Sequence, residues 1–247
     1  MEKINMTDLT ILILVRLDSI SRLQNILIVS DFLCSHLSAE IHIREASSFN
    51  NGILARLLSN SVIYEWVEDN SPILHKTKHF NKMLARVDTK FVSIWDADVL
   101  CNMKYVDQCI EKLRNNEADM ALPYNGVCLD TSEIIKELFY KSHDISIFEK
   151  YYQFMQRLNQ HRLVGGAVIM NTEVFKRLGG ENESYYGWGD DDFDRYIKFM
   201  NNGKKIFRTN NILFHLSHER GVNSNYSSKV REYLSKAELY KTIHTIP

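Results

Sequence analysis

The first hundred residues alternate short apolar runs with stretches of helical spacing. Residues 10–15 (TILILV) form a continuous apolar run, which predicts a short strand buried on both faces. Apolar positions then recur three or four residues apart between residues 23 and 33, as in an amphipathic helix. Further strands are predicted over 41–43, 62–67 and 90–95, and a further helix over 80–87. This alternation is typical of a parallel sheet with crossover helices.

The rest of the chain continues with less regular elements. They are a helix over 103–116, a strand over 120–122, a polar helical stretch over 132–160, a strand led by Gly165-Gly166, a helix opened by an acidic cluster, a strand over 212–218 and a closing helix over 227–244. No internal repeat and no linker rich in Pro, Gly or Ser divides the sequence. We therefore expect a single α/β domain over 1–247, with functional halves 1–124 and 125–247.

Composition narrows the class of protein. The chain has 30 Lys and Arg against 31 Asp and Glu, and 45% of its residues are hydrophobic, so it is neither disordered nor basic enough to indicate a nucleic-acid partner. Four scattered cysteines without Cys-x-x-Cys spacing favour a reducing compartment over a secreted disulfide framework. The early apolar run 11–15 is roughly a third of the length of a membrane-spanning helix. We expect a cytoplasmic protein, and a peripheral position on the inner face of the membrane stays open.

Two carboxylates follow the predicted strand 90–95. Open parallel sheets bind ligands beyond the carboxyl ends of their strands, and Asp96 and Asp98 stand at such an end. Oxygen donors suit Mg²⁺ or Mn²⁺, so the pair can share one divalent ion and the phosphates bound to it. A solvated turn with an Asp at the next helix start is the alternative interpretation.

Two histidines lie in the predicted strand 212–218. His215 and His218 are three residues apart and would face opposite sides of a regular strand, so both reach one ion only if the strand ends or bends near His218. Neutral imidazoles bind Mn²⁺ and Zn²⁺ well. A buried structural role is the alternative for either histidine alone.

An acidic cluster follows a tryptophan between two glycines. Asp190, Asp191 and Asp192 come directly after Gly187-Trp188-Gly189, and adjacent carboxylates repel one another unless a ligand, a cation or a helix N-terminus compensates. Helix capping explains one or two of these acids. A carboxylate here can act as a general base, and the tryptophan can pack against a sugar ring.

Two adjacent glycines, Gly165 and Gly166, precede a predicted strand and argue against a nicotinamide-dependent enzyme. Gly165-Gly166 opens a strand rather than a helix, so the dinucleotide-binding fingerprint is absent, and adjacent glycines indicate a ligand packed against bare backbone. The sequence also contains neither a Walker phosphate loop nor a Gly-x-Ser-x-Gly nucleophile elbow, which argues against a P-loop kinase and an α/β-hydrolase.

Four stretches of the chain follow the order of one family's motifs. They are Val15-Arg16-Leu17-Asp18, Phe80-Asn81-Lys82, Trp95-Asp96-Ala97-Asp98 and the block from Gly165-Gly166 through Trp188-Gly189-Asp190-Asp191-Asp192 to Gly203. Together they resemble the GT-A fold glycosyltransferases, in the branch that includes the β-1,4-galactosyltransferases and bacterial chondroitin-type polymerases. In that family the four motifs are a nucleotide-contacting turn, a Phe-Asn-Arg segment packed on uracil, the Asp-x-Asp motif and a Gly-Gly…Trp-Gly-Gly-Glu-Asp block.

The chain departs from this family at several positions. The block from Trp188 to Gly203 aligns with the family's motif without gaps. In this alignment Asp190 stands at the family's second glycine, Asp191 at its glutamate and Asp192 at its catalytic aspartate. His218 resembles the family's metal-binding histidine, and His215 stands where galactosyltransferases use a methionine ligand. The likeness is thin between residues 125 and 163, where acceptor specificity would be set.

The resemblance implies a GT-A fold, with a Rossmann-like, mostly parallel sheet flanked by helices. It implies a metal-dependent, inverting transfer of a Gal, GalNAc or Glc type sugar from a UDP-sugar to a hydroxyl of a glycan or lipid-linked glycan, as in bacterial surface polysaccharide assembly. Asp98, His218 and His215 would hold Mn²⁺ or Mg²⁺, Asp192 would be the base, and Asp191 would orient the acceptor. The donor would lie among Arg16, Asp18, Phe80, Lys82, Asp96, Gly165, Gly166 and Trp188.

Three alternatives stay open. A sugar nucleotidyltransferase would normally show a glycine-rich basic loop in its first turn, and residues 15–19 contain no glycine. A catalytically silent nucleotide-sugar or glycan-binding module would not need the joint presence of Asp96, Asp98, Asp192 and His218. A retaining transferase differs from the inverting one in the anomeric configuration of its product.

Overall fold

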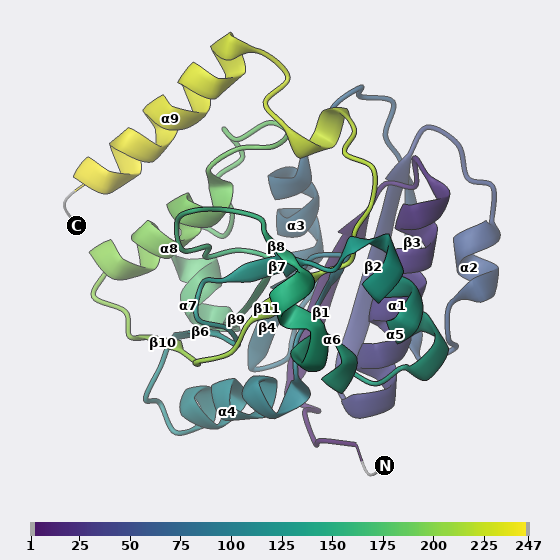
Figure 1. The fold of residues 1–247 in the computed structure, drawn as a ribbon. Helices are drawn as coiled ribbons and strands as arrows, with labels where there is room; N and C mark the ends of the chain where they lie inside the picture. The colour runs from purple at the N-terminus through teal and green to yellow at the C-terminus, as the bar shows by residue number, and fades with distance from the viewer. Residues whose placement is uncertain (1–2, 246–247) are drawn as a thin grey trace.

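A computed structural model describes residues 3–245, and two sheets form its centre (Figure 1). The strands are β1 (Leu9–Val15), β2 (Glu40–Ser47), β3 (Val62–Glu68), β4 (Phe91–Trp95), β5 (Val99–Leu100), β6 (Met120–Leu122), β7 (Cys128–Asp130), β8 (Gln156–Arg157), β9 (Ala167–Asn171), β10 (Ile206–Arg208) and β11 (Leu213–His215). Seven of them form one sheet in the order β10-β6-β9-β4-β1-β2-β3, and four form a smaller sheet in the order β5-β11-β7-β8.

The larger sheet is mostly parallel. Strand β1 pairs in parallel with β2 and β4, and β2 with β3, as the apolar runs of the first hundred residues predict. Strand β9 is antiparallel to both of its neighbours, β4 and β6. The start of β9 therefore lies at the same edge as the ends of β1 and β4. The predicted α/β fold with a mostly parallel sheet in a single domain is confirmed.

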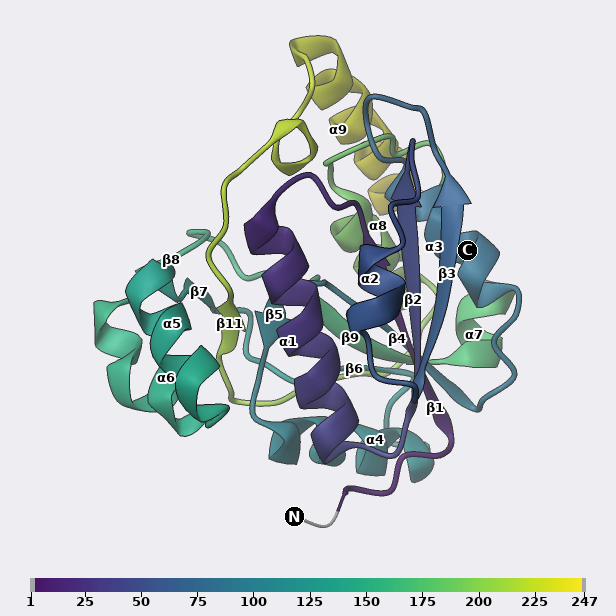
Figure 2. The same ribbon diagram turned by 90° about the vertical axis from the view of Figure 1, so that its right-hand side faces the viewer.

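Helices pack on both sides of this sheet. The helices of the described residues are α1 (Ile20–His36), α2 (Ile53–Leu57), α3 (Lys76–Leu84), α4 (Met103–Arg114), α5 (Ser132–Ser142), α6 (Ser146–Tyr151), α7 (Thr172–Arg177), α8 (Asp191–Asn201) and α9 (Lys229–His244), with 3₁₀ turns η1 (Tyr152–Phe154) and η2 (Val222–Ser224). Figure 2 shows α1 on one side of the strands and α3 and α7 on the other. Helix α9 packs against α8. No helix between residues 3 and 245 is long and apolar enough to cross a membrane.

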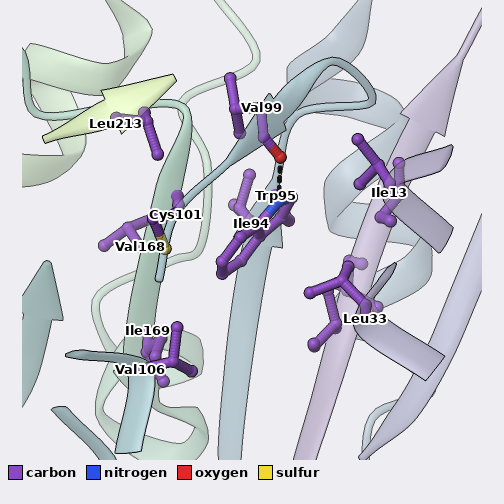
Figure 3. Packing of buried hydrophobic residues seen from close by; sticks show 14 of the residues in the cluster. Ile13, Leu33, Ile94, Trp95, Val99, Cys101, Val106, Val168, Ile169 and Leu213 are labelled. Atoms are coloured by element: carbon purple, nitrogen blue, oxygen red, sulfur yellow. Dashed lines mark hydrogen bonds between the residues drawn. The ribbon is translucent and has the colours of Figure 1, made fainter. Parts of the chain in front are cut away.

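The core supports the turn that carries the two strand-end carboxylates. Trp95, the last residue of β4, is fully buried, and its indole Nε1 donates to the carbonyl of Val99 at 3.0 Å (Figure 3). This bond closes the loop that contains Asp96 and Asp98. Burial of a large apolar side chain contributes about 1.5–3 kcal/mol, so the position of this turn is tied to the packing of the core.

Several predicted elements have other boundaries. The polar stretch predicted as helical over 132–160 is divided into α5, α6, η1 and β8, because the chain turns at His143, whose φ of 53° ends α5. Helix α3 starts four residues before the predicted range 80–87, since its first turn is mainly polar. Strand β11 ends at His215 rather than at residue 218. The short elements α2, β5, β7, α7 and β10 were not predicted.

Candidate active site

Glycines and carboxylates meet at the edge where β1 and β4 end. The antiparallel register pairs Trp95 with Ala167, and beyond it the backbone N–H of Asp96 donates to the carbonyl of Gly166 at 2.7 Å. Gly166 has a φ of +78°, and a Cβ there would lie 2.7 Å from Leu213 Cδ2 and 3.9 Å from Asp96 Oδ2. Gly165-Gly166 thus lies beside the exposed Asp96 carboxylate, where side chains would fill the space.

One carboxylate and two imidazoles form a compact cluster. Candidate ligand atoms of Asp98, His215 and His218 all lie within 4.8 Å of one another. The Nε2 atoms of His218 and His215 are 3.0 and 3.8 Å from Asp98 Oδ2. Both rings face one carboxylate because β11 ends at His215 and the chain bends, with the N–H of Leu216 donating to the carbonyl of Asp98 at 2.7 Å.

The charges of this cluster suit a divalent cation. Burial would raise the pKa of Asp98, but His215, His218 and Arg22 outweigh it and lower that pKa to about 2. Burial would lower the pKa of His215, yet Asp98 and Asp130 raise it. Asp98 is therefore ionised at neutral pH and can serve as an anionic ligand. A mixed set of one carboxylate oxygen and two imidazole nitrogens fits Mn²⁺ or a similar divalent transition ion.

The second carboxylate group lies at the start of α8. An ideal Cβ on Gly165 would lie 2.0 Å from Oδ2 of Asp192, so the Asp192 carboxylate rests directly on the bare backbone. The buried Arg195 guanidinium pairs with this carboxylate one turn along the helix. Although burial opposes it, Lys76 and Arg195 lower the pKa of Asp192, which is therefore ionised at neutral pH.

Two further acids of this region have raised pKa values. Burial raises the pKa of Asp191 to about 6, although Lys76 Nζ lies 2.8 Å from its Oδ2 and opposes the shift. Burial also raises the pKa of Glu181 to about 7 against the opposing charge of Arg195, whose NH1 is 3.2 Å from Glu181 Oε1. Two cations therefore hold three acids together at this end of α8.

The remaining predicted donor residues lie in different surroundings. Arg16 follows β1, donates to the carbonyls of Ala46 and Ser71, and pairs with Asp69 at 2.9 Å. Asp18 pairs with Arg22 at 2.9 Å, and Arg22 reaches to 4.0 Å from Asp98. The contacts of Arg22 connect the turn after β1 to the histidine cluster.

Helix α3 contributes a residue other than those predicted from it. Phe80 is buried in the hydrophobic core and Lys82 is exposed, whereas Lys76 in the first turn contacts Asp191. Trp188 is 43% exposed, and its ring packs edge to face with that of Tyr226, with 4.8 Å between centroids.

Four site residues were not predicted from the sequence: Lys76, Arg22, Arg195 and Glu181. The spacing of Arg195, three residues after Asp192 on a predicted helix, is a signal that could have found it. Lys76 precedes the Phe80-Asn81-Lys82 segment by one helical turn. Because the predicted helix begins at residue 80, the sequence pattern does not indicate that Lys76 lies on the same helix. Glu181 and Arg22 reach the site through tertiary contacts.

Comparisons with known proteins agree with this geometry. A family model described as the N-terminal domain of galactosyltransferase matches residues 146–219, a range that contains Gly165, the acidic cluster and both histidines. Beta-1,4-galactosyltransferase 7 of Drosophila melanogaster is 28% identical over 78 residues, which are 32% of this chain and 22% of that relative. The chain thus matches about a fifth of the length of that curated relative.

A solved structure shares the fold. It is the mannosyltransferase PcManGT from Pyrobaculum calidifontis, in complex with GDP-Man and Mn²⁺, with a TM-score of 0.54 and 16% identity over 96% of this chain and 69% of that one. Together the comparisons support a glycosyltransferase of the GT-A fold.

Proposed function

We propose that the protein is a metal-dependent, inverting glycosyltransferase that uses a UDP-sugar of Gal, GalNAc or Glc type. One observation carries this proposal: the ionised Asp192 on Gly165 and the cluster of Asp98, His215 and His218 lie at the same strand-end edge. In the displacement of a nucleoside diphosphate by a hydroxyl, a base takes the proton of the hydroxyl and a cation stabilises the leaving diphosphate. The edge offers a candidate residue set for each.

The residues around Asp98 would serve the leaving group. A divalent cation held by Asp98, His215 and His218 would act as a Lewis acid toward the diphosphate. Both imidazoles must be neutral to bind it, so the raised pKa of His215 opposes metal binding as the pH falls. Arg22 adds a fixed positive charge 4.0 Å from Asp98. Asp96 and the Gly165-Gly166 backbone would contact the donor sugar, and Arg16, Asp18 and Lys82 would lie around the nucleotide. Phe80, which is buried in the core, would support the helix that carries Lys82.

The residues at the start of α8 would serve the acceptor. Asp192 would take the proton of the attacking hydroxyl as the new bond to the anomeric carbon forms and the bond to the diphosphate breaks, which inverts that carbon in one step. Asp191, oriented by Lys76, would accept a hydrogen bond from the acceptor. Trp188 is exposed enough to pack against a sugar ring.

The remaining parts of the proposal rest on the family resemblance. Residues 1–124 would form the donor half and residues 125–247 the acceptor half. The acceptor would be a glycan or a lipid-linked glycan in bacterial surface polysaccharide assembly, on a cytoplasmic protein that could lie against the inner face of the membrane. The choice of UDP as the nucleotide rests on the resemblance to the galactosyltransferases, whose family model matches residues 146–219.

Calorimetric titration tests the donor. UDP, GDP, UDP-Gal, UDP-GalNAc, UDP-Glc and GDP-Man are titrated into metal-stripped protein with and without Mn²⁺. We expect UDP compounds to bind only with Mn²⁺. Tight GDP-Man binding would replace the nucleotide assignment, and no binding of any nucleotide would favour the silent module.

Asp192→Asn tests the chemistry. Removal of a general base costs about 10²–10⁴-fold in rate, so transfer should fall by that factor while Mn²⁺-dependent UDP binding stays near wild type. Asp88→Asn, at an exposed carboxylate, is the matched control. The anomeric configuration of the product, measured by NMR, separates inversion from retention. Collapse of UDP binding in Asp192→Asn would show that the base assignment is wrong.

A further inference from the structure

Asp190 is the acid that stands where the resembling family has a glycine, and its hydrogen-bond partners differ from the partners of Asp191 and Asp192. Its Oδ2 accepts hydrogen bonds from Tyr226 Oη at 2.9 Å and from Ser235 Oγ at 2.8 Å. Its backbone N–H donates to Ser235 Oγ at 3.0 Å. Ser235 is the buried residue of α9, so this residue of the loop is bonded to the C-terminal helix at two points.

The neighbours of Asp190 show how closely the loop and α9 approach. A Cβ on Gly189 would lie 2.8 Å from Ser235 Oγ, so no other residue fits there without a shift. The rings of Trp188 and Tyr226 pack edge to face. Tyr226 thus contacts both Trp188 and Asp190, and Ser235 contacts Asp190.

Helix α9 also contacts α8 further along. Thr242 Oγ1 donates to Asp194, and Asn201 Nδ2 donates to the carbonyl of Thr242 at 2.7 Å. The helix that begins with Asp191 and Asp192 is therefore held along its length by α9, and the bonds to Asp190 are the ones next to the proposed acceptor-contacting residues.

We propose that Tyr226 and Ser235 are positioning residues that hold Asp190, and through it Trp188 and Asp191, in the geometry that receives the acceptor. This inference rests on the proposed function. It assigns the C-terminal helix a part in acceptor binding, and it explains the acid at the glycine position as the residue that this helix holds.

Loss of the hydrogen bonds to Asp190 should affect the acceptor side of the site and leave the donor side unchanged. Without the two hydroxyls, the Asp190 carboxylate loses both side-chain donors and its N–H loses its acceptor, so the loop over 187–190 gains freedom. The proposed cation ligands Asp98, His215 and His218 come from other segments, and none of these bonds touches them. Acceptor binding should weaken while donor binding does not.

The test compares a double variant, Tyr226→Phe with Ser235→Ala, with the control Tyr233→Phe with Ser227→Ala, at exposed positions of the same segment. Loss of hydrogen bonds to a charged group amounts to about tenfold or more, so the acceptor KM should rise by about that factor with the donor KM unchanged. Asp190→Asn, which keeps an acceptor oxygen, should retain more activity than Asp190→Ala. An unchanged acceptor KM, or equal changes in the KM of donor and acceptor, would overturn the proposal.

Hydrogen–deuterium exchange gives a readout that needs no turnover. The double variant should exchange faster over 187–192 than the control, with no change around 215–218. Equal exchange in variant and control would overturn the inference. If the wild-type protein transfers no sugar, the proposed function fails while exchange still decides whether Tyr226 and Ser235 hold the loop.

Discussion

Gly165→Ala probes the contact on which the proposed chemistry depends. An ideal Cβ at residue 165 would lie 2.0 Å from Oδ2, 2.3 Å from Cγ and 2.8 Å from Oδ1 of Asp192. Ordinary contact begins near 3.4 Å, so the carboxylate must move by roughly 1.4 Å. Since a displacement of about 1 Å can cost about 100-fold in rate, we expect kcat/KM for transfer to fall about 100-fold, or about 2.7 kcal/mol in the barrier.

The same substitution should leave the fold nearly unchanged. Gly165 does not have a positive φ, so alanine fits its backbone conformation. The side chain that must move, Asp192, is 32% exposed and can turn toward solvent. We expect the free energy of unfolding, from urea denaturation, to change by no more than about 1 kcal/mol.

The assay is the initial rate of sugar transfer, with Mn²⁺-dependent UDP binding measured by calorimetry in parallel. Gly221→Ala is the matched control, because its Cβ would make an ordinary 3.7 Å contact with Asp18 Oδ2 and its φ is −92°. A transfer rate for Gly165→Ala within about threefold of wild type would refute the reasoning. Loss of UDP binding in step with transfer would show instead that Gly165 shapes the donor site.

Three further changes test other parts of the site. His218→Ala removes a proposed metal ligand. Loss of a residue that only hydrogen-bonds to a ligand costs roughly 10–100-fold in metal affinity, so the Kd for Mn²⁺, measured by calorimetry, should rise by more than that. An unchanged Kd would show that His218 has a structural role. Lys76→Met leaves the buried Asp191 without its cation. Because Lys76 is 28% exposed, we expect the free energy of unfolding in urea to fall by about 1–3 kcal/mol, less than for a fully buried pair. An unchanged free energy of unfolding would contradict the pairing. Burial raises the pKa of Glu181 to about 7 in the folded protein, above its ordinary value of 4.5, so its contribution to stability decreases as pH rises between these values. Glu181→Gln should remove that part of the slope of Tm against pH, and an equal slope in both proteins would contradict the raised pKa.

Much of the fold follows from local patterns. The apolar run of β1 and the strand before Asp96 are short, as strands buried on both faces are, and both form where they are predicted. The α/β class with a parallel sheet was predicted from the alternation of elements, whereas the GT-A fold was implied by the resemblance of four motifs to one family. The region 132–160 was predicted wrongly because a polar pattern does not show a break such as the left-handed His143.

The chemistry-bearing residue types and their order are local properties, and the sequence alone indicates them: acids after a strand, acids at a helix start, two histidines near a strand end. Which side chain pairs with each of these acids depends on contacts between segments far apart in the chain. Lys76 reaches Asp191, Tyr226 and Ser235 reach Asp190, and Phe80 turns into the core, because helix positions and strand directions bring together segments that lie far apart in the chain. Periodicity reports the inner face of an element, whereas partners across elements depend on how those faces pack.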